Sequence, residues 1–433
     1  MKKTIVLLIT AVLALTTTIF AYTPHENMDG LQHETATLAT YNTLPSIFVD
    51  TSAELWENRY VWQDGTLTII GYLHNEQAQF RGRGNSTWEL WRHYKIPFNF
   101  RVPQPVHIAG FENPGVSFIL LANHIDRSLM RNFNALYLAN LMYGMNFAPE
   151  VKPVQVYING EYQGVYLLTE HRVPARLQAD YVIELMMGAP DRGGEVYIDW
   201  FEANERYYLI RDSQNNTVEA GMALADFVSR ASYAIRSGNF AEIEQYFYIP
   251  ALVDFYVVQE LFASSDAGMF SVWMQIRNDG DRQLIHMGPV WDFDAAAGII
   301  NHVSFLPQFE NPWVHLPEGL AVAELNYWYR ELVQIPEFNE LLVPRLRYLV
   351  DYSLPRTLDK MWYYVNEYRS SFERNFYIHS AGPGDWSVYS LPALTYHIDT
   401  FYEHIVFLDD FLETRALWLY NFFQSGTPTL VWP

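Results

Sequence analysis

The sequence predicts an α+β fold with a β-rich N-terminal half and an α-rich C-terminal half. Short runs of alternating apolar residues, separated by turn signals, dominate the chain up to about residue 215. From Val218 onward, apolar residues recur at helical spacing over long stretches. Hydrophobic residues make up 50% of the 433 positions, so the chain can bury a large core.

The N-terminal half contains two predicted β-hairpins. Tyr60 to Leu73 alternates in polarity and contains Asp64-Gly65, a pair typical of a hairpin turn. Val154 to Glu170 is the clearer hairpin, because an Asn-Gly pair separates two alternating apolar runs. Further strands are predicted at Val116–Leu121, Tyr181–Leu185, Glu195–Trp200 and Arg206–Arg211, and a helix at Leu129–Leu141.

The C-terminal half is predicted to be helical apart from one further hairpin. A helical pattern over Leu252–Ala263 is followed by an aromatic strand-like run, Phe270–Arg277, then by a polar turn and a second apolar run. Long amphipathic patterns occupy most of the remaining chain. Helices are predicted at Val218–Ser237, Phe240–Phe247, Leu320–Val350, Leu358–Phe376 and Ala393–Phe423.

The start of the chain is typical of a secretory signal peptide. Lys2 and Lys3 form a basic start, Thr4 to Leu15 is continuously apolar, and Ala21 suits cleavage. A membrane-anchoring helix is the alternative, although the apolar run is short for a span. We expect export to an extracellular, periplasmic or cell-surface location, with no membrane attachment once the signal is removed.

These patterns divide the chain into four predicted segments. Residues 1–21 are the signal peptide, 22–43 a flexible tail, 44–425 one folded domain and 426–433 a C-terminal tail. Within the folded domain, residues 44–215 are the β-rich part and residues 216–425 the helical part.

The composition excludes several kinds of chemistry. No cysteine is present, so thiol catalysis, cysteine-ligated zinc and disulfides are excluded. The formal net charge is −21, from 28 basic and 49 acidic residues, which argues against nucleic acid and anionic membranes as partners. This charge suits a basic protein partner, although solubility alone also accounts for it. We expect a monomer.

One stretch, Gln259–Gly298, carries a concentrated set of carboxylates. Asp266 follows the predicted helix, while Asp292 and Asp294 follow the hairpin, so these side chains lie at element ends where they can converge. Carboxylates suit Mg²⁺ or Ca²⁺, and Mg²⁺ usually takes further oxygens from phosphate. The order of aspartate, hairpin and aspartate is also that of protein kinases. The alternative is that these residues only cap a helix and a turn.

A glycine-containing loop lies in the N-terminal half. It has the sequence RGRGN, from Arg81 to Asn85, and its backbone N–H groups and two arginines could bind an anion. Lys95 is predicted on the strand that follows. In protein kinases a glycine loop and a strand lysine together bind nucleotide phosphates, although here Thr87 replaces the third glycine. An ordinary tight turn is the alternative.

Five segments follow one another along the chain: RGRGNSTWE with KIPFNF, LLANHIDRSLMRN, VYINGEYQGVYLLTE, GPVWDFDAAAG and FLDDFLETRALWL. In this order they resemble the CotH kinase family, the spore-coat protein kinases and their exported bacterial relatives. The resemblance covers about Leu44 to Phe423. It implies an atypical protein-kinase-like fold that transfers phosphate from ATP, with Mg²⁺ or Mn²⁺, to serine or threonine of a protein.

The resemblance also implies roles for individual residues. Asp266 is similar to the catalytic aspartate that accepts the hydroxyl proton, and Asp292 to the metal-binding aspartate, with Asp294 as a second candidate ligand. Lys95 is similar to the lysine that contacts the phosphates, and we expect both Lys95 and Asp266 to be catalytic residues. The other nucleotide-binding candidates are Arg81 and Arg83, which would face the phosphates, Asn85 in the same loop, Trp291, which could stack on adenine, and Glu170, a partner for Lys95 or a site acid.

Three positions depart from the pattern of kinases. Ile96 stands in place of the family's second lysine, and Ser264 in place of the asparagine before the catalytic aspartate. Ser271 occupies the position where typical kinases have a metal-binding asparagine, and a hydroxyl is a poorer metal ligand than an amide carbonyl.

The leading prediction is a secreted, Mg²⁺-dependent kinase that transfers the ATP γ-phosphate to serine or threonine of exported or surface proteins. One alternative is a catalytically weakened pseudokinase that acts as a binding or structural protein of the cell envelope. Another is a glycoside hydrolase, because paired carboxylates and 13 tryptophans suit a sugar site.

Overall fold

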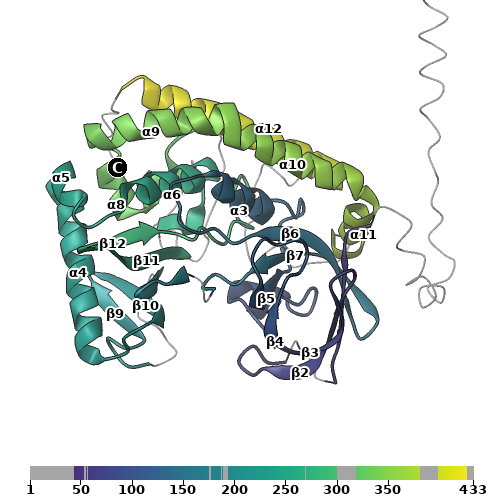
Figure 1. The fold of residues 1–433 in the computed structure, drawn as a ribbon. Coiled ribbons are helices and arrows are strands. Elements are labelled where there is room, and N and C mark those ends of the chain that lie inside the picture. The colour runs from purple at the N-terminus through teal and green to yellow at the C-terminus, as the bar shows by residue number, and fades with distance from the viewer. Residues whose placement is uncertain are drawn as a thin grey trace, which may run out of the picture. The chain divides into compact units, whose positions relative to one another are not determined.

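The computed structural model describes most of the chain (Figure 1). The described residues are 43–52, 55, 57–174, 177–186, 188, 194–268, 270–299, 318–380 and 398–426. The predicted signal peptide, the predicted tail up to residue 42 and residues 427–433 lie outside them.

The first half of the chain forms a closed barrel of seven strands in the order β1-β2-β3-β4-β5-β7-β6. All neighbouring pairs are antiparallel except β1 and β6, whose parallel pairing closes the barrel. Phe80, Phe98 and Tyr166 are almost fully buried inside it. The strands are β1 (Ser46–Asp50), β2 (Gln63–Ile69), β3 (Leu73–Gly82), β4 (Phe98–Val106), β5 (Gly115–Leu121), β6 (Val151–Ile158) and β7 (Glu161–Glu170).

One predicted turn is wrong. Asp64-Gly65 lies inside β2, and the turn between β2 and β3 is at residues 70–72, where the Tyr72 N–H donates to the Ile69 carbonyl at 2.9 Å. A Cβ atom at Gly65 would lie 2.5 Å from the Asp50 carbonyl oxygen. Glycine is therefore required here by close packing between strands, which a local turn signal cannot distinguish. The second predicted hairpin is confirmed, with its turn at residues 159–160.

A second sheet joins the two halves of the chain. Its five strands run in the order β12-β11-β8-β10-β9, and β8 from the first half pairs with β11 from the second. The strand predicted at Glu195–Trp200 is reduced to a single bridge between Val196 and Trp200, and β9 follows it. The strands are β8 (Tyr181–Met186), β9 (Trp200–Ala203), β10 (Arg206–Ser213), β11 (Val272–Asp279) and β12 (Arg282–Met287).

Helices dominate the second half, as predicted, but the longest predicted helices are interrupted. Asn326 caps the start of α8, because its side-chain oxygen accepts the Trp328 N–H at 3.0 Å. Pro336 begins the next helix. The predicted helix over residues 393–423 is described only from residue 398 onward. None of the described helices is long and apolar enough to cross a membrane.

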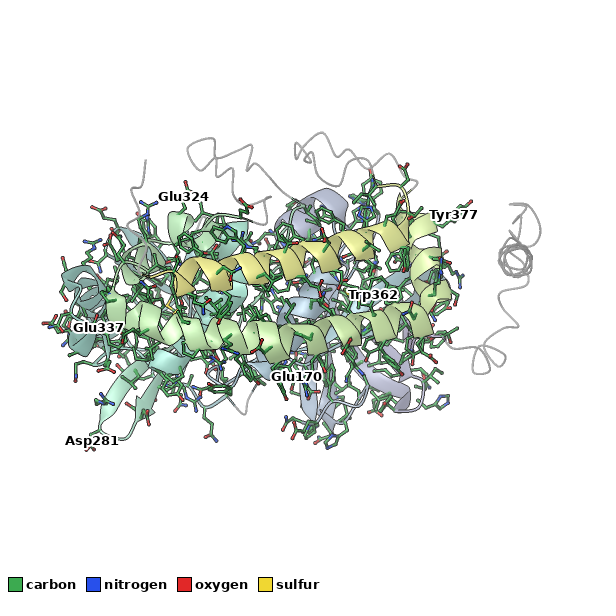
Figure 2. All side chains as sticks on the ribbon, turned by 90° about the horizontal axis from the view of Figure 1, so that it is seen from above. Glu170, Asp281, Glu324, Glu337, Trp362 and Tyr377 are labelled. Carbon is green, nitrogen blue, oxygen red and sulfur yellow. The ribbon has the colours of Figure 1, made fainter. Side chains whose placement is uncertain are left out.

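The helical segments that the structure describes are short in the first half and long near the end of the chain. They are α2 (Ser86–Trp91), α3 (Arg131–Leu141), α4 (Val218–Ser237), α5 (Phe240–Ile243), α6 (Ile249–Leu261), a 3₁₀ turn (Ser265–Gly268), α7 (Ala321–Leu325), α8 (Tyr327–Leu332), α9 (Pro336–Tyr348), a π-helical turn (Leu349–Ser353), α10 (Leu354–Glu367), α11 (Arg369–Ser380) and α12 (Phe401–Gln424). Figure 2 shows α12 lying beside the continuous run of α9 and α10.

A buried ion pair holds α12 against α6. The Arg415 guanidinium donates to the Glu260 carboxylate at 2.7 Å and, through Nε, to the Glu260 carbonyl at 2.6 Å. The same carboxylate accepts the N–H groups of Val322 and Ala323 at the start of α7, both at 3.1 Å. Glu260 and Arg415 are completely buried, so each charge depends on the other for compensation.

We expect Arg415→Met to lower the free energy of unfolding by about 3–5 kcal/mol, because it leaves Glu260 charged and unpaired in the interior. The measurement is urea unfolding followed by circular dichroism. Arg230→Met is the control, since Arg230 pairs with Asp226 on an exposed helix face and its loss should cost at most about 1 kcal/mol. Equal stability of the two variants would contradict this prediction.

Candidate active site

The loop after β12 carries the predicted metal-binding acids, and the start of α3 holds it in place. The Phe293 N–H, between the two acids, donates to the Asn132 side-chain oxygen at 2.8 Å. The Arg131 guanidinium donates to the carbonyls of Ala296 at 2.9 Å and Ala297 at 3.0 Å. Arg131 is itself buried and paired with Asp126 at 2.7 Å. This segment therefore fixes the backbone on which Asp292 and Asp294 are carried.

Left-handed backbone conformations gather around this loop. Asp292 has φ of 70°, Ala297 47°, Ser271 54° and Ala263 46°, and none of these residues is glycine. Such conformations are uncommon for non-glycine residues and persist where surrounding contacts impose them. One such contact is the 2.7 Å hydrogen bond from the Ala297 N–H to the Phe262 carbonyl at the end of α6. The backbone is thus held in an unusual shape where the acids converge.

The carboxylates influence one another strongly. Burial, the Asp292 charge and the Glu184 charge raise the pKa of Asp266 to about 7. Burial and the charges of Asp292, Asp126 and Asp266 raise the pKa of Asp294 well above its ordinary value. Like charges held this close favour a bound cation or a retained proton. The Ser271 hydroxyl donates to the Asp292 carboxylate at 3.2 Å, so this hydroxyl lies beside a candidate metal ligand.

Two arginines oppose the acids, and both pack on Trp291. The Arg83 guanidinium lies 5.6 Å from the Trp291 ring centroid, and the Arg172 guanidinium lies 4.9 Å from it. Arg172 also lies 4.6 Å from the ring of Trp273 on β11. Burial lowers the pKa of Arg83, while the charges of Asp292, Asp294 and Glu184 raise it. The acids and this arginine therefore share one electrostatic environment.

The arginine side of the site contains buried donors without acceptors. Among the described residues, these are the Nε atoms of Arg83 and Arg172 and the indole N–H groups of Trp273 and Trp291. Burial and the Arg83 charge lower the pKa of Arg172 to about 9. The nearby Glu184 carboxylate already accepts a hydrogen bond from Arg211 at 2.6 Å. Unpaired buried N–H groups are costly, so this set suits an anionic ligand.

The donor set fits a nucleotide with a divalent ion better than a metal alone. Within the described part of the chain, no group of three or more acidic or histidine side chains is arranged to hold a metal ion. Mg²⁺ commonly binds through one or two carboxylates, with phosphate oxygens completing its shell. Asp292 and Asp294 could supply the carboxylates, and the unpaired N–H groups could meet the phosphates.

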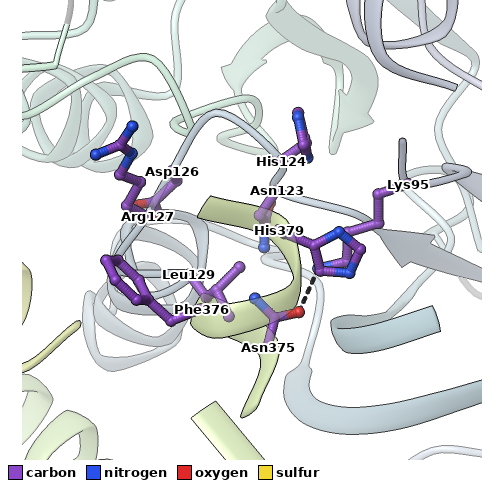
Figure 3. Close-up of a pocket in the computed structure, with 9 residues that line it drawn as sticks. All are labelled: Lys95, Asn123, His124, Asp126, Arg127, Leu129, Asn375, Phe376 and His379. Carbon is purple, nitrogen blue, oxygen red and sulfur yellow. Dashed lines mark hydrogen bonds between the residues drawn. The ribbon is translucent and has the colours of Figure 1, made fainter. Parts of the chain in front are cut away.

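The Lys95 side chain is hydrogen-bonded to protein groups other than the candidate site residues (Figure 3). It precedes β4, is 1% exposed, and donates to the Val165 carbonyl at 2.5 Å and to the Asn375 side-chain oxygen at 3.1 Å. Its ammonium also lies 4.7 Å from the Tyr166 ring centroid. Burial lowers the pKa of Lys95 well below its ordinary value, and the Asp126 charge opposes this shift. These contacts connect the barrel to α11.

The other predicted binding residues are dispersed. Arg81 packs on the Trp62 ring at 4.6 Å, and Asn85 precedes α2, where its carbonyl accepts the Glu89 N–H at 2.9 Å. Glu170, at the end of β7, accepts the Glu150 N–H at 2.9 Å. The structure therefore brings together Asp266, Asp292, Asp294, Trp291 and Arg83.

The predicted glycine loop has a packing role. A Cβ atom at Gly82 would lie 1.9 Å from the Trp88 ring, so only glycine lets this tryptophan cover the end of the barrel. Arg83 follows directly, and its N–H donates to the Pro97 carbonyl at 3.0 Å. The loop thus directs Arg83 toward the acids by fixing its backbone.

Sequence reasoning missed Arg172 and Glu184 as site residues. Arg172 lies two positions beyond Glu170, where the recognised hairpin pattern ends. Glu184 is the single charged residue within an apolar strand, β8, and an isolated charge in such a strand could have indicated a functional role. Their neighbours Trp291 and Asp266 come from distant parts of the sequence, so spacing alone could not assign them a role.

Comparison with known protein families indicates a kinase-like protein. A model of the family described as CotH kinase protein matches residues 80–419, which is most of the chain. The chain therefore belongs to the CotH kinase family. A search of curated proteins found no match.

We expect the stability of the metal-free protein to depend on pH through the titration of Asp266. Its pKa is about 7 in the folded state, against about 3.9 for an unfolded aspartate. Between these values the folded state retains a proton that the unfolded state releases, so stability falls as pH rises from about 4 to about 7. Thermal unfolding in chelator, compared with Asp266→Asn, measures this contribution.

The difference in unfolding midpoint, wild type minus Asp266→Asn, should become more negative over this pH range. Asp281→Asn is the matched control, because Asp281 lies at the exposed tip of the β11–β12 hairpin and should follow wild type (Figure 2). A difference that stays flat or increases with pH would contradict the prediction.

Proposed function

We propose that this protein is an exported, Mg²⁺- or Mn²⁺-dependent kinase that transfers the ATP γ-phosphate to serine or threonine of exported or surface proteins. Membership of the CotH kinase family supports the kinase-like part of the proposal. One observation supports the nucleotide and metal site. Asp266 and Asp294, whose pKa values are raised by burial and by neighbouring acids, share the site with buried arginine Nε and indole N–H groups that lack acceptors.

Each side of the site has a distinct task in this proposal. Asp292 and Asp294 would hold the divalent ion, which would neutralise negative charge on the phosphate oxygens. Arg83 donates to phosphate oxygens and restricts their position. Trp291 and the β11 hairpin exclude water around these groups, which strengthens their electrostatic effect.

Asp266 acts as the general base. Its carboxylate accepts the proton of the substrate hydroxyl while the hydroxyl oxygen bonds to the γ-phosphorus. The bond from that phosphorus to the oxygen bridging it to the β-phosphorus breaks, and ADP leaves with that oxygen. Burial is the first cause of the raised pKa of Asp266, and it makes this carboxylate a stronger base than an exposed aspartate.

The net charge of −21 suits a basic protein substrate, because opposite charges increase the rate of encounter. A pseudokinase of the cell envelope is the alternative. The hydrogen bonds from Lys95 to Val165 and Asn375 favour the pseudokinase, since a kinase that needed this lysine to bind phosphate would be weakened.

The test is phosphate transfer from γ-labelled ATP to exported acceptor proteins, with Mg²⁺ or Mn²⁺. We expect labelled serine or threonine, and a loss of about 10²–10⁴-fold in Asp266→Asn, because the general base is removed. Asp292→Asn should also lose transfer. Asp281→Asn, on an exposed turn, should match wild type.

Label that persists in both site variants would contradict the proposed roles. ATP binding without any transfer would instead establish the pseudokinase. Absence of both binding and transfer would remove the proposed function.

A further inference from the structure

We propose that the nucleotide phosphates are held by the pair Arg83 and Arg172, with Trp291 as their shared support, and that Lys95 makes no phosphate contact. This inference rests on the proposed function and identifies which cations serve it. It reassigns the phosphate-contacting role, expected at Lys95, to an arginine outside the recognised motifs.

Two of the three N–H groups of Lys95 already donate to protein acceptors, although its side chain lines the small pocket shown in Figure 3. Its ammonium donates to two protein oxygens and faces the Tyr166 ring, with 1% of the residue exposed. The Asn375 oxygen that accepts from Lys95 also accepts the Val165 N–H at 2.8 Å. Turning Lys95 toward a nucleotide would break this three-way contact and leave buried polar groups unpaired. Lys95 therefore fastens α11 to β7.

Arg83 and Arg172 have the opposite character. Both stack on one indole, both have a buried Nε atom without an acceptor, and each charge lies within range of the other. Two adjacent guanidiniums repel unless an anion lies between or across them. Guanidinium forks bind phosphate with paired hydrogen bonds, which an ammonium cannot do.

The acids stabilise these charges from a distance, but the buried Nε atoms of Arg83 and Arg172 have no hydrogen-bond acceptor. The Glu184 carboxylate accepts from Arg211, and the Asp292 carboxylate accepts from Ser271. The indole N–H groups of Trp273 and Trp291 add two further unpaired donors on the same side. A polyanion that also binds a divalent ion would accept hydrogen bonds from the arginines and indoles while its ion binds the aspartates. A triphosphate has this chemistry.

Trp291 accordingly supports the arginines and does not stack on adenine. It is 2% exposed, and two guanidiniums pack on its ring. Recognition should therefore depend on the phosphate chain more than on the base. Affinity should fall from ATP through ADP and AMP to adenosine.

The experiment is calorimetric titration of the full chain with ATP and Mg²⁺, and separately with adenosine. Arg172→Gln should weaken ATP binding about 10–100-fold, because charge-assisted hydrogen bonds are lost, without changing the response to adenosine. Arg83→Gln should act in the same way, as a second variant. Arg230→Gln, on an exposed helix face, is the matched control and should bind ATP like wild type.

Lys95→Met separates the two roles. It should leave ATP affinity within about threefold of wild type while lowering the thermal unfolding midpoint, because only the contact of α11 is lost. The inference is overturned if Lys95→Met abolishes ATP binding in a folded protein, or if Arg172→Gln and Arg83→Gln both bind ATP like wild type. If wild type itself binds no ATP, the proposed function fails first, which distinguishes the two outcomes.

Discussion

The crowding of like charges in a partly buried site is the constraint on which the rest of the site depends. Burial, and then the neighbouring acidic charges, raise the pKa values of Asp266 and Asp294, while burial and the Arg83 charge lower the pKa of Arg172. Neither arrangement is favourable by itself. Both become favourable with a ligand that carries a divalent cation toward the acids and anionic oxygens toward the arginines.

The fold supplies this arrangement by combining distant parts of the chain. The barrel contributes Arg83 and, just beyond β7, Arg172, while the second sheet contributes Glu184 and Trp273. The pairing of β8 with β11 places Glu184 opposite Trp273 within the second sheet. The Arg172 guanidinium, which packs on Trp273 and Trp291, connects the barrel side to these residues. The start of α3 then holds the acidic loop through Arg131 and Asn132. Several buried polar groups thus serve to place a few reactive side chains.

Much of the fold could be predicted from the sequence, because its signals were local. The helix Val218–Ser237 and the hairpin at residues 159–160 are confirmed, since periodicity and turn residues decide them. Asp64-Gly65 misled because barrel packing, and not a turn, requires that glycine. The acids were predictable from their place at element ends. The role of Arg172 was not, because its support, Trp291, lies 119 residues away by the sequence numbering.

The most direct test is a crystal structure of the full chain with a non-hydrolysable ATP analogue and Mn²⁺, whose anomalous scattering locates the metal. We expect the metal at Asp292 and Asp294, with the phosphate oxygens within hydrogen-bonding distance of Arg83 and Arg172. A metal and phosphates bound elsewhere, or phosphates contacted by Lys95 and by neither arginine, would contradict this account.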